Sequence, residues 1–112
     1  MKRTDQCIMV DDEQGLNETL KAGERVIALF YASWCPFCAS FLPVFERHAA
    51  GEGLTFVAVK DDQESVGDPY SVEIVPTALF FEKGKVTRRL DGIRGMGLNE
   101  KQLTDFIKAC AP

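Results

Sequence analysis

Residues 26–32 form an unbroken apolar run, Val-Ile-Ala-Leu-Phe-Tyr-Ala, in which polar and apolar side chains do not alternate. Such a run is typical of a central strand that is covered on both faces. From Pro36 onward, the apolar side chains recur instead at the spacing of one helix face: Cys38, Phe41, Leu42, Phe45 and Ala49. A buried strand followed directly by an amphipathic helix predicts a sheet with helices packed on it.

Similar patterns predict the remaining elements. Strands are expected at residues 7–10, 54–59, 77–81 and 86–90, helices at about 12–22 and after residue 99, and a short helix or turn within 62–70. Asn99 and Gln102 have the spacing of a capping box, and Lys83-Gly84 is a hairpin turn signal. The resulting order, β-α-β-α-β-α-β-β-α, predicts an α/β fold with a central mixed β-sheet flanked by helices on both faces.

The chain has 112 residues, a length that predicts a single domain over residues 1–112. With 46% hydrophobic and 27% charged residues, the composition excludes a disordered chain. No stretch approaches the roughly 18 apolar residues of a membrane span, and no apolar segment of a secretory signal follows Met1-Lys2-Arg3. We therefore expect a soluble, cytoplasmic protein that does not bind a membrane.

The net charge of -4 argues against a nucleic-acid partner, because most of the surface repels phosphates. One basic concentration falls along the predicted hairpin: Lys83, Lys85, Arg88, Arg89 and Arg94. We interpret it as the solvated face of an edge strand. The glycines within residues 92–97 match neither a P-loop nor a G-x-G-x-x-G fingerprint, so we predict no phosphate site there.

Cys35 and Cys38 are separated by Pro36-Phe37 at the junction between the central strand and the following helix. This context favours a redox site, because unpaired backbone N–H groups and the helix dipole stabilise a thiolate at Cys35. Cys38 lies one turn inside the helix, on its apolar face, where desolvation favours the protonated thiol. We therefore predict that Cys35 attacks and Cys38 resolves. A purely structural disulfide is disfavoured, since closing a four-residue ring stabilises a fold by only about 2 kcal/mol.

A metal site is an alternative interpretation of the pair, because two cysteines at this spacing can hold half of a zinc tetrahedron. The other candidate ligands are distant in the sequence: Cys7, His48 and Cys110. We expect Cys7 and Cys110 to act as small buried hydrophobes and His48 to be solvated. We therefore predict no metal site within one chain, and a zinc or iron–sulfur site only if two subunits share their Cys35 and Cys38.

The chain resembles the thioredoxin family over nearly its whole length. The resemblance is carried by Phe-Tyr-Ala-Ser-Trp-Cys at residues 30–35, Cys38, Pro43, Val75-Pro76-Thr77, Lys83-Gly84 and Gly92. It implies the thioredoxin fold and a thiol-disulfide oxidoreductase that reduces protein disulfides without a bound cofactor, in electron transport and cell redox homeostasis. It also implies a thioredoxin-reductase-like flavoprotein as electron donor, and we expect a monomer.

The same resemblance implies a substrate groove beside the cysteines. In this interpretation Pro76 is a cis proline opposite them, and Val75 binds an extended substrate strand through its backbone. The groove is expected to be flanked by Trp34, Gly92 and Ile93.

Three departures from the family pattern predict an atypical member of the family that the chain resembles. Pro36-Phe37 replaces the usual Gly-Pro and is similar to the glutaredoxin dipeptide, which predicts a different redox potential. Leu29 replaces a buried Asp and Ala58 the lysine paired with it, so Cys38 must lose its proton to water or to another group. Asp61 and Asp91 are expected to add negative charge to a groove that is commonly apolar, thereby changing partner choice and opposing the thiolate.

Two further functions remain as alternatives. A glutaredoxin-like enzyme would use glutathione, but Trp34, Val75 and the lack of a recognisable glutathione-carboxylate motif argue against it. A redox-inactive interaction domain is disfavoured by the intact cysteine pair.

Overall fold

The computed structural model describes residues 7–49 and 53–110. Its elements in chain order are β1 (Cys7–Val10), α1 (Glu13–Ala22), β2 (Arg25–Tyr31), α2 (Pro36–Arg47), β3 (Thr55–Lys60), the 3-10 helix η2 (Asp68–Tyr70), β4 (Thr77–Glu82), β5 (Lys85–Asp91) and α3 (Glu100–Cys110). This is the order that the sequence predicts. Within the two described ranges, no helix is long and apolar enough to cross a membrane.

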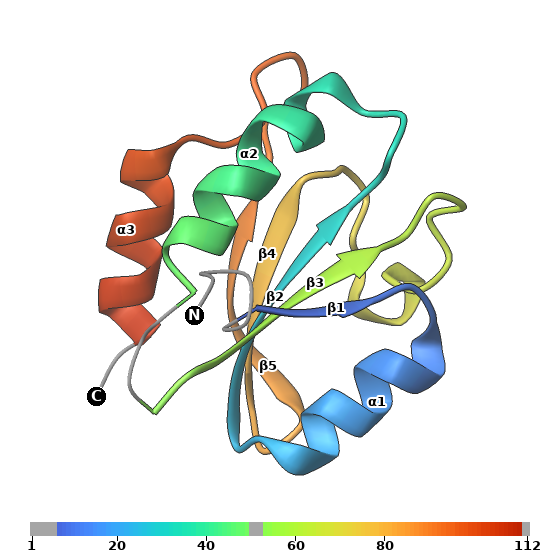
Figure 1. Cartoon of the computed structure of the whole chain (residues 1–112), viewed down its shortest axis with the longest axis vertical. Helices are drawn as coiled ribbons and strands as arrows, with labels where there is room; N and C mark the ends of the chain where they lie inside the picture. Colours follow the sequence, from blue (N-terminus) through green and yellow to red (C-terminus); the bar gives the residue numbers. More distant parts are fainter. Residues whose placement is uncertain (1–6, 50–52, 111–112) are drawn as a thin grey trace.

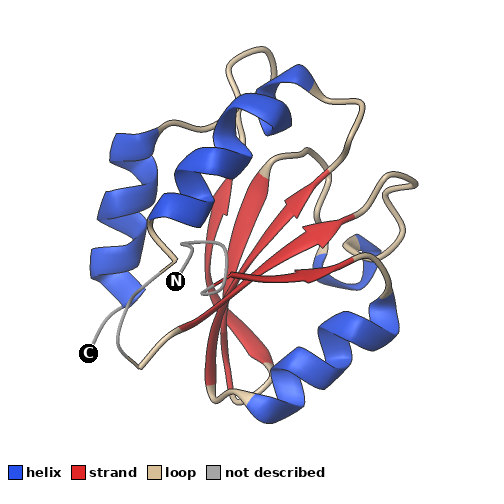
Figure 2. Cartoon of the chain, in the orientation of Figure 1, coloured by secondary structure: helices blue, strands red, loops and turns tan. Residues whose placement is uncertain are grey.

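The five strands form one sheet in the order β1-β3-β2-β4-β5 (Figure 2). β1, β3 and β2 run parallel, whereas β4 is antiparallel to β2 and β5 is antiparallel to β4. The predicted mixed sheet is therefore confirmed. β2 lies at the centre, as its unbroken apolar run predicts, and β5 forms an edge on which Arg88 and Arg89 are exposed.

Helices cover both faces of the sheet: α1 packs on one face, and α2 and α3 pack on the other (Figure 1). The core between the sheet and α2–α3 is built mainly from Ile27, Leu29, Phe41, Phe45, Phe56, Phe80 and Leu103. The core under α1 is built mainly from Leu16, Val26, Phe30, Val57, Leu79 and Phe81. Because burial of apolar surface is the main driving force of folding, these two layers hold β2 and the start of α2 in fixed positions.

The helix ends follow local chemistry. α2 begins with Cys35 as its N-cap and Pro36 in its first turn, where a missing N–H is no loss. The capping box of α3 is confirmed: the Asn99 N–H donates to Gln102 Oε1 at 2.9 Å, and the Gln102 N–H donates to Asn99 Oδ1 at 2.8 Å. α2 continues through Pro43 and ends at Arg47.

The loop after β3 contains the short η2 helix and is organised around Asp61. The buried carboxylate accepts three backbone N–H bonds, from Ser65 at 2.9 Å, from Val66 at 3.0 Å and from Gly67 at 2.9 Å. The expectation that Asp61 adds charge to a substrate groove is therefore wrong. These N–H groups need an acceptor inside the loop, and the carboxylate turns inward to provide it.

Candidate functional site

The two central cysteines lie where β2 ends and α2 begins. The side chain of Cys35 is 6% exposed and that of Cys38 is 1% exposed, and both are free thiols. The Cys38 N–H donates to the Sγ of Cys35 at 3.4 Å, and the Ala32 N–H donates to the Sγ of Cys38 at 3.5 Å. Cys35 therefore sits at a helix N-terminus, where N–H groups stabilise a negative sulfur.

Cys38 has a different environment, inside the first turn of α2. Burial is the main cause that raises the pKa of Cys38 to about 12, and the adjacent Cys35 raises it further. At neutral pH the Cys38 thiol is thus protonated, as the sequence pattern predicts. The positions that face each other across β2 and β3 beneath this helix, Leu29 and Ala58, are fully buried aliphatic side chains. They offer no proton acceptor.

The Val75-Pro76 peptide bond is cis, and Val75 lies against Cys35. The thiol of Cys35 donates a weak hydrogen bond to the carbonyl oxygen of Val75 at 3.8 Å. Beside Cys35 lies an open pocket of about 220 Å³, whose other lining residues are Trp34, Glu64, Glu73, Ile74, Val75 and Arg94. This pocket opens beside the otherwise buried Cys35.

Trp34 is 57% exposed but is held in place. Its indole N–H donates to the carbonyl oxygen of Asp62 at 2.9 Å. The Asp62 carboxylate in turn accepts from the Ser33 N–H at 2.6 Å and from the Ser33 hydroxyl at 2.7 Å, and these bonds lower its pKa. A large apolar side chain beside Cys35 is therefore presented to solvent in a fixed orientation.

The segment after β5 closes the other side of the site. Gly92 approaches Pro76 so closely that an added Cβ would lie 2.3 Å from the Pro76 carbonyl oxygen. Gly97 lies against Phe37, where an added Cβ would meet the Phe37 Cβ at 2.8 Å. Ile93 stands exposed in the same turn. The structure thus brings Gly92 to Pro76 and Gly97 to Phe37.

Three charged residues of this site were not singled out as site residues from the sequence: Glu64, Glu73 and Arg94. Glu64 and Glu73 lie in the loops on either side of η2, and Arg94 lies in the turn after β5. No local pattern brings these loops together, because their meeting depends on how the sheet places its strand ends. Asp91, which the sequence suggested as a groove carboxylate, is exposed at the end of β5 and pairs with Arg89 at 2.9 Å.

The other candidate metal ligands do not join the pair. Cys7 and Cys110 are buried free thiols, and burial raises the pKa of Cys7 to about 12 and that of Cys110 to about 11. His48 is partly exposed, and its Nε2 lies 2.7 Å from a carboxylate oxygen of the exposed Glu100 on α3. In the part of the chain that the structure describes, no group of three or more His, Cys, Asp or Glu residues could hold a metal ion.

Comparison with known proteins identifies the fold and the family of this site. The family model described as thioredoxin matches residues 7–109. A thioredoxin from Mycoplasmoides gallisepticum is 32% identical over 101 residues, which cover 88% of this chain and 97% of that protein. Protein disulfide-isomerase A5 from Bos taurus is 27% identical over 111 residues, which cover 94% of this chain but only 21% of that protein. A mutant thioredoxin from Halobacterium salinarum has a solved structure with a TM-score of 0.80 at 25% identity, covering 100% of this chain and 96% of that one.

Proposed function

Because this chain belongs to the thioredoxin family and is a thiol-disulfide oxidoreductase, we propose that Cys35 and Cys38 carry the reaction as a dithiol–disulfide pair. The observation that carries this proposal is the placement of the two sulfurs. One caps the N-terminus of α2 next to a pocket, and the other lies buried within the same turn. This arrangement separates an attacking sulfur from a resolving one.

The proposed cycle has two exchange steps. The Cys35 thiolate attacks one sulfur of a substrate disulfide, and the other substrate sulfur leaves as a thiolate that takes up a proton. Cys38 then loses its proton and attacks the Sγ of Cys35, which releases the second substrate sulfur. The substrate gains two electrons and two protons, and the enzyme is left with a Cys35–Cys38 disulfide. These two exchange steps transfer the electrons without a bound cofactor.

Around the sulfurs, we assign the substrate groove to the backbone of Val75 and to the surfaces of its neighbours. An extended substrate segment would pair with the Val75 backbone, in the manner of an added strand. The groove would be flanked by Trp34, Pro36, Phe37, Pro76, Gly92 and Ile93. Exposed apolar side chains at Trp34, Phe37 and Ile93 suit the apolar surface around a protein disulfide.

The remaining assignments follow from family membership. Thioredoxins act on disulfide substrates and are re-reduced by a reductase, and we propose a thioredoxin-reductase-like flavoprotein as the donor here. We also propose that residues 1–112 act as one thioredoxin-like domain, as a monomer in the cytoplasm. Such a reducing compartment suits a chain whose buried thiols at Cys7 and Cys110 are free.

Reduction of insulin disulfides by dithiothreitol, followed as turbidity, tests the proposal. The wild type should accelerate the reaction, Cys35→Ser should abolish the acceleration, and Cys38→Ser should accumulate a mixed disulfide. Cys110→Ser removes another buried thiol and is the matched control that should retain activity. If the wild type gave no acceleration over dithiothreitol alone, this function would be refuted.

The Pro36-Phe37 dipeptide, similar to that of glutaredoxins, favours one second candidate, reduction of glutathione mixed disulfides. Phe37 is exposed beside the site and available to a small substrate. A glutathione-coupled assay on a glutathionylated substrate separates the two candidates. Activity with glutathione but not with insulin would favour the glutaredoxin-like enzyme.

A further inference from the structure

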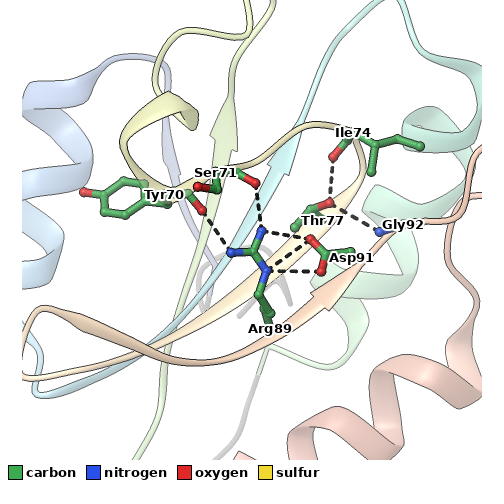
Figure 3. A network of polar contacts seen from close by, with 7 residues as sticks. All are labelled: Tyr70, Ser71, Ile74, Thr77, Arg89, Asp91 and Gly92. Carbon is green, nitrogen blue, oxygen red and sulfur yellow. Dashed lines mark hydrogen bonds and ion pairs between the residues drawn. The ribbon is translucent and has the colours of Figure 1, made fainter.

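Arg89 reaches from the edge strand β5 across to the loop that leads into Val75 (Figure 3). One terminal nitrogen of its guanidinium, Nη1, donates to the carbonyl oxygen of Tyr70 at 3.0 Å, and the other, Nη2, donates to that of Ser71 at 3.0 Å. The carboxylate of Asp91 accepts from Nε at 3.1 Å and from Nη2 at 2.9 Å. Asp91 therefore orients the planar guanidinium, and the guanidinium holds two consecutive backbone carbonyls.

The loop is fixed where Arg89 binds it. The Tyr70 ring packs against Phe81 and Phe30, with centroid distances of 5.1 and 6.2 Å. Ser71 has a left-handed backbone with φ of 59°, a conformation that non-glycine residues adopt at a cost and that needs support from its surroundings. The arginine bonds add to the support that the Ser71 N–H gives by donating to Asp68 and the Val72 N–H by donating to Gly67.

A second anchor holds the far end of the same segment. The Thr77 hydroxyl donates to the carbonyl oxygen of Ile74 at 2.6 Å and accepts from the Gly92 N–H at 3.3 Å (Figure 3). Glu73 and Ile74, which lie between the two anchors, form part of the wall of the pocket beside Cys35. The position of this wall, and of Val75 after it, thus depends on Arg89 at one end and on Thr77 at the other.

We propose that Arg89, oriented by Asp91, is a positioning residue that holds residues 71–75 ready to bind an extended disulfide-bearing segment of a protein substrate. This inference rests on the proposed function. Without the arginine, the loop would have to be ordered during binding. The cost of that ordering would weaken the binding of protein substrates but not of small disulfides. A small disulfide that enters the pocket without pairing to the Val75 backbone does not need the ordered loop.

The experiment compares Arg89→Gln with Arg88→Gln in insulin reduction and in the reaction with 5,5′-dithiobis(2-nitrobenzoate). Arg88 is the matched control, because it is exposed on the same strand and its loss changes the charge equally. For Arg89→Gln we expect KM for insulin to rise by about three- to tenfold with kcat nearly unchanged. The rate with the small disulfide should stay close to that of Arg88→Gln. Hydrogen exchange at residues 71–75 should be faster in Arg89→Gln only.

Arg89→Lys tests whether charge alone is enough. A lysine keeps the charge beside Asp91 but cannot bind both carbonyls with a planar fork, so KM should remain raised. Equal insulin KM values in Arg89→Gln and Arg88→Gln would overturn the proposal. A wild-type KM in Arg89→Lys would also overturn it, as would an equal loss of rate with insulin and with the small disulfide in Arg89→Gln. Because the wild type is assayed alongside, failure of the proposed function would show as an inactive wild type instead.

Discussion

At the scale of residues, two sulfurs one helical turn apart have opposite environments. Cys35 caps the N-terminus of α2 beside the pocket, whereas Cys38 is desolvated and its pKa is raised to about 12. Leu29 and Ala58 place two buried aliphatic side chains at the positions where the resemblance to the family led us to expect a carboxylate and a lysine. In the proposed cycle, Cys38 must therefore lose its proton without a buried carboxylate at that position.

This environment predicts a steep pH dependence for the resolving step. Below a pKa of about 12, the thiolate fraction of Cys38 rises about tenfold for each pH unit. We expect the rate of resolution to rise by about the same factor for each unit between roughly pH 7 and 9. Stopped-flow mixing with 5,5′-dithiobis(2-nitrobenzoate) measures it as the second phase of thionitrobenzoate release. Cys38→Ser should lack this phase, and a rate that levels off below pH 9 would reveal a proton acceptor near Cys38.

At the scale of elements, the residues after β3 show how adjacent carboxylates can hold two different loops. Asp61 turns inward and accepts three backbone N–H bonds from residues 65–67. Asp62 turns outward and binds Ser33, and its backbone carbonyl fixes the Trp34 ring. The two residues after β3 thus hold both the loop before η2 and the segment that precedes Cys35.

We expect Asp61→Ala to lower the free energy of unfolding by about 2–4 kcal/mol, because it leaves buried backbone donors without their charged acceptor. Urea denaturation followed by circular dichroism measures this loss. Asp68→Ala is the control, since it removes an exposed carboxylate from the same loop, and it should change stability by less than about 0.5 kcal/mol. Similar losses in the two variants would contradict the role assigned to Asp61.

At the scale of the whole molecule, packing of α2 and α3 on one face of the sheet buries three thiols and shifts their pKa values in the same direction. Cys7 lies on β1, Cys38 on α2 and Cys110 at the end of α3, and all three belong to apolar clusters. Burial is in each case the main cause that raises the pKa, to about 12, about 12 and about 11 respectively. The folded state therefore binds thiol protons more tightly than the unfolded chain does.

Because the folded state holds these thiol protons more tightly, raising the pH lowers its stability relative to the unfolded chain. Above about pH 9 the unfolded chain loses thiol protons that the folded chain retains, so stability falls as pH rises toward the raised pKa values. Between pH 8 and pH 10.5, under reducing conditions, we expect Tm to fall by about 5 °C or more. A Cys7→Ala, Cys110→Ala double variant lacks two of the three thiols but keeps the other titratable groups. Its Tm should therefore fall less over the same pH range. An equal fall in both proteins would count against buried thiols as the cause.

Local patterns in the sequence predicted the elements and the reactive pair. An unbroken apolar run identified β2 as a central strand, helical spacing identified α2, and the Asn99–Gln102 box marked the start of α3. Cys35 and Cys38 could be predicted as neighbours because only one helical turn separates them, and the structure places them within hydrogen-bonding distance. These features depend on interactions between residues that are near neighbours in the chain, and so the sequence alone determined them.

Tertiary structure decided which distant loops surround the cysteines. Glu64, Glu73 and Arg94 meet beside Cys35, and Arg89 reaches the carbonyls before Val75, because the sheet order places the ends of β2, β4 and β5 side by side. The same packing turned Asp61 into a buried loop acceptor rather than a groove residue. Whether a charged side chain faces a substrate or a neighbouring backbone depends on contacts across the fold, which spacing along the chain does not encode.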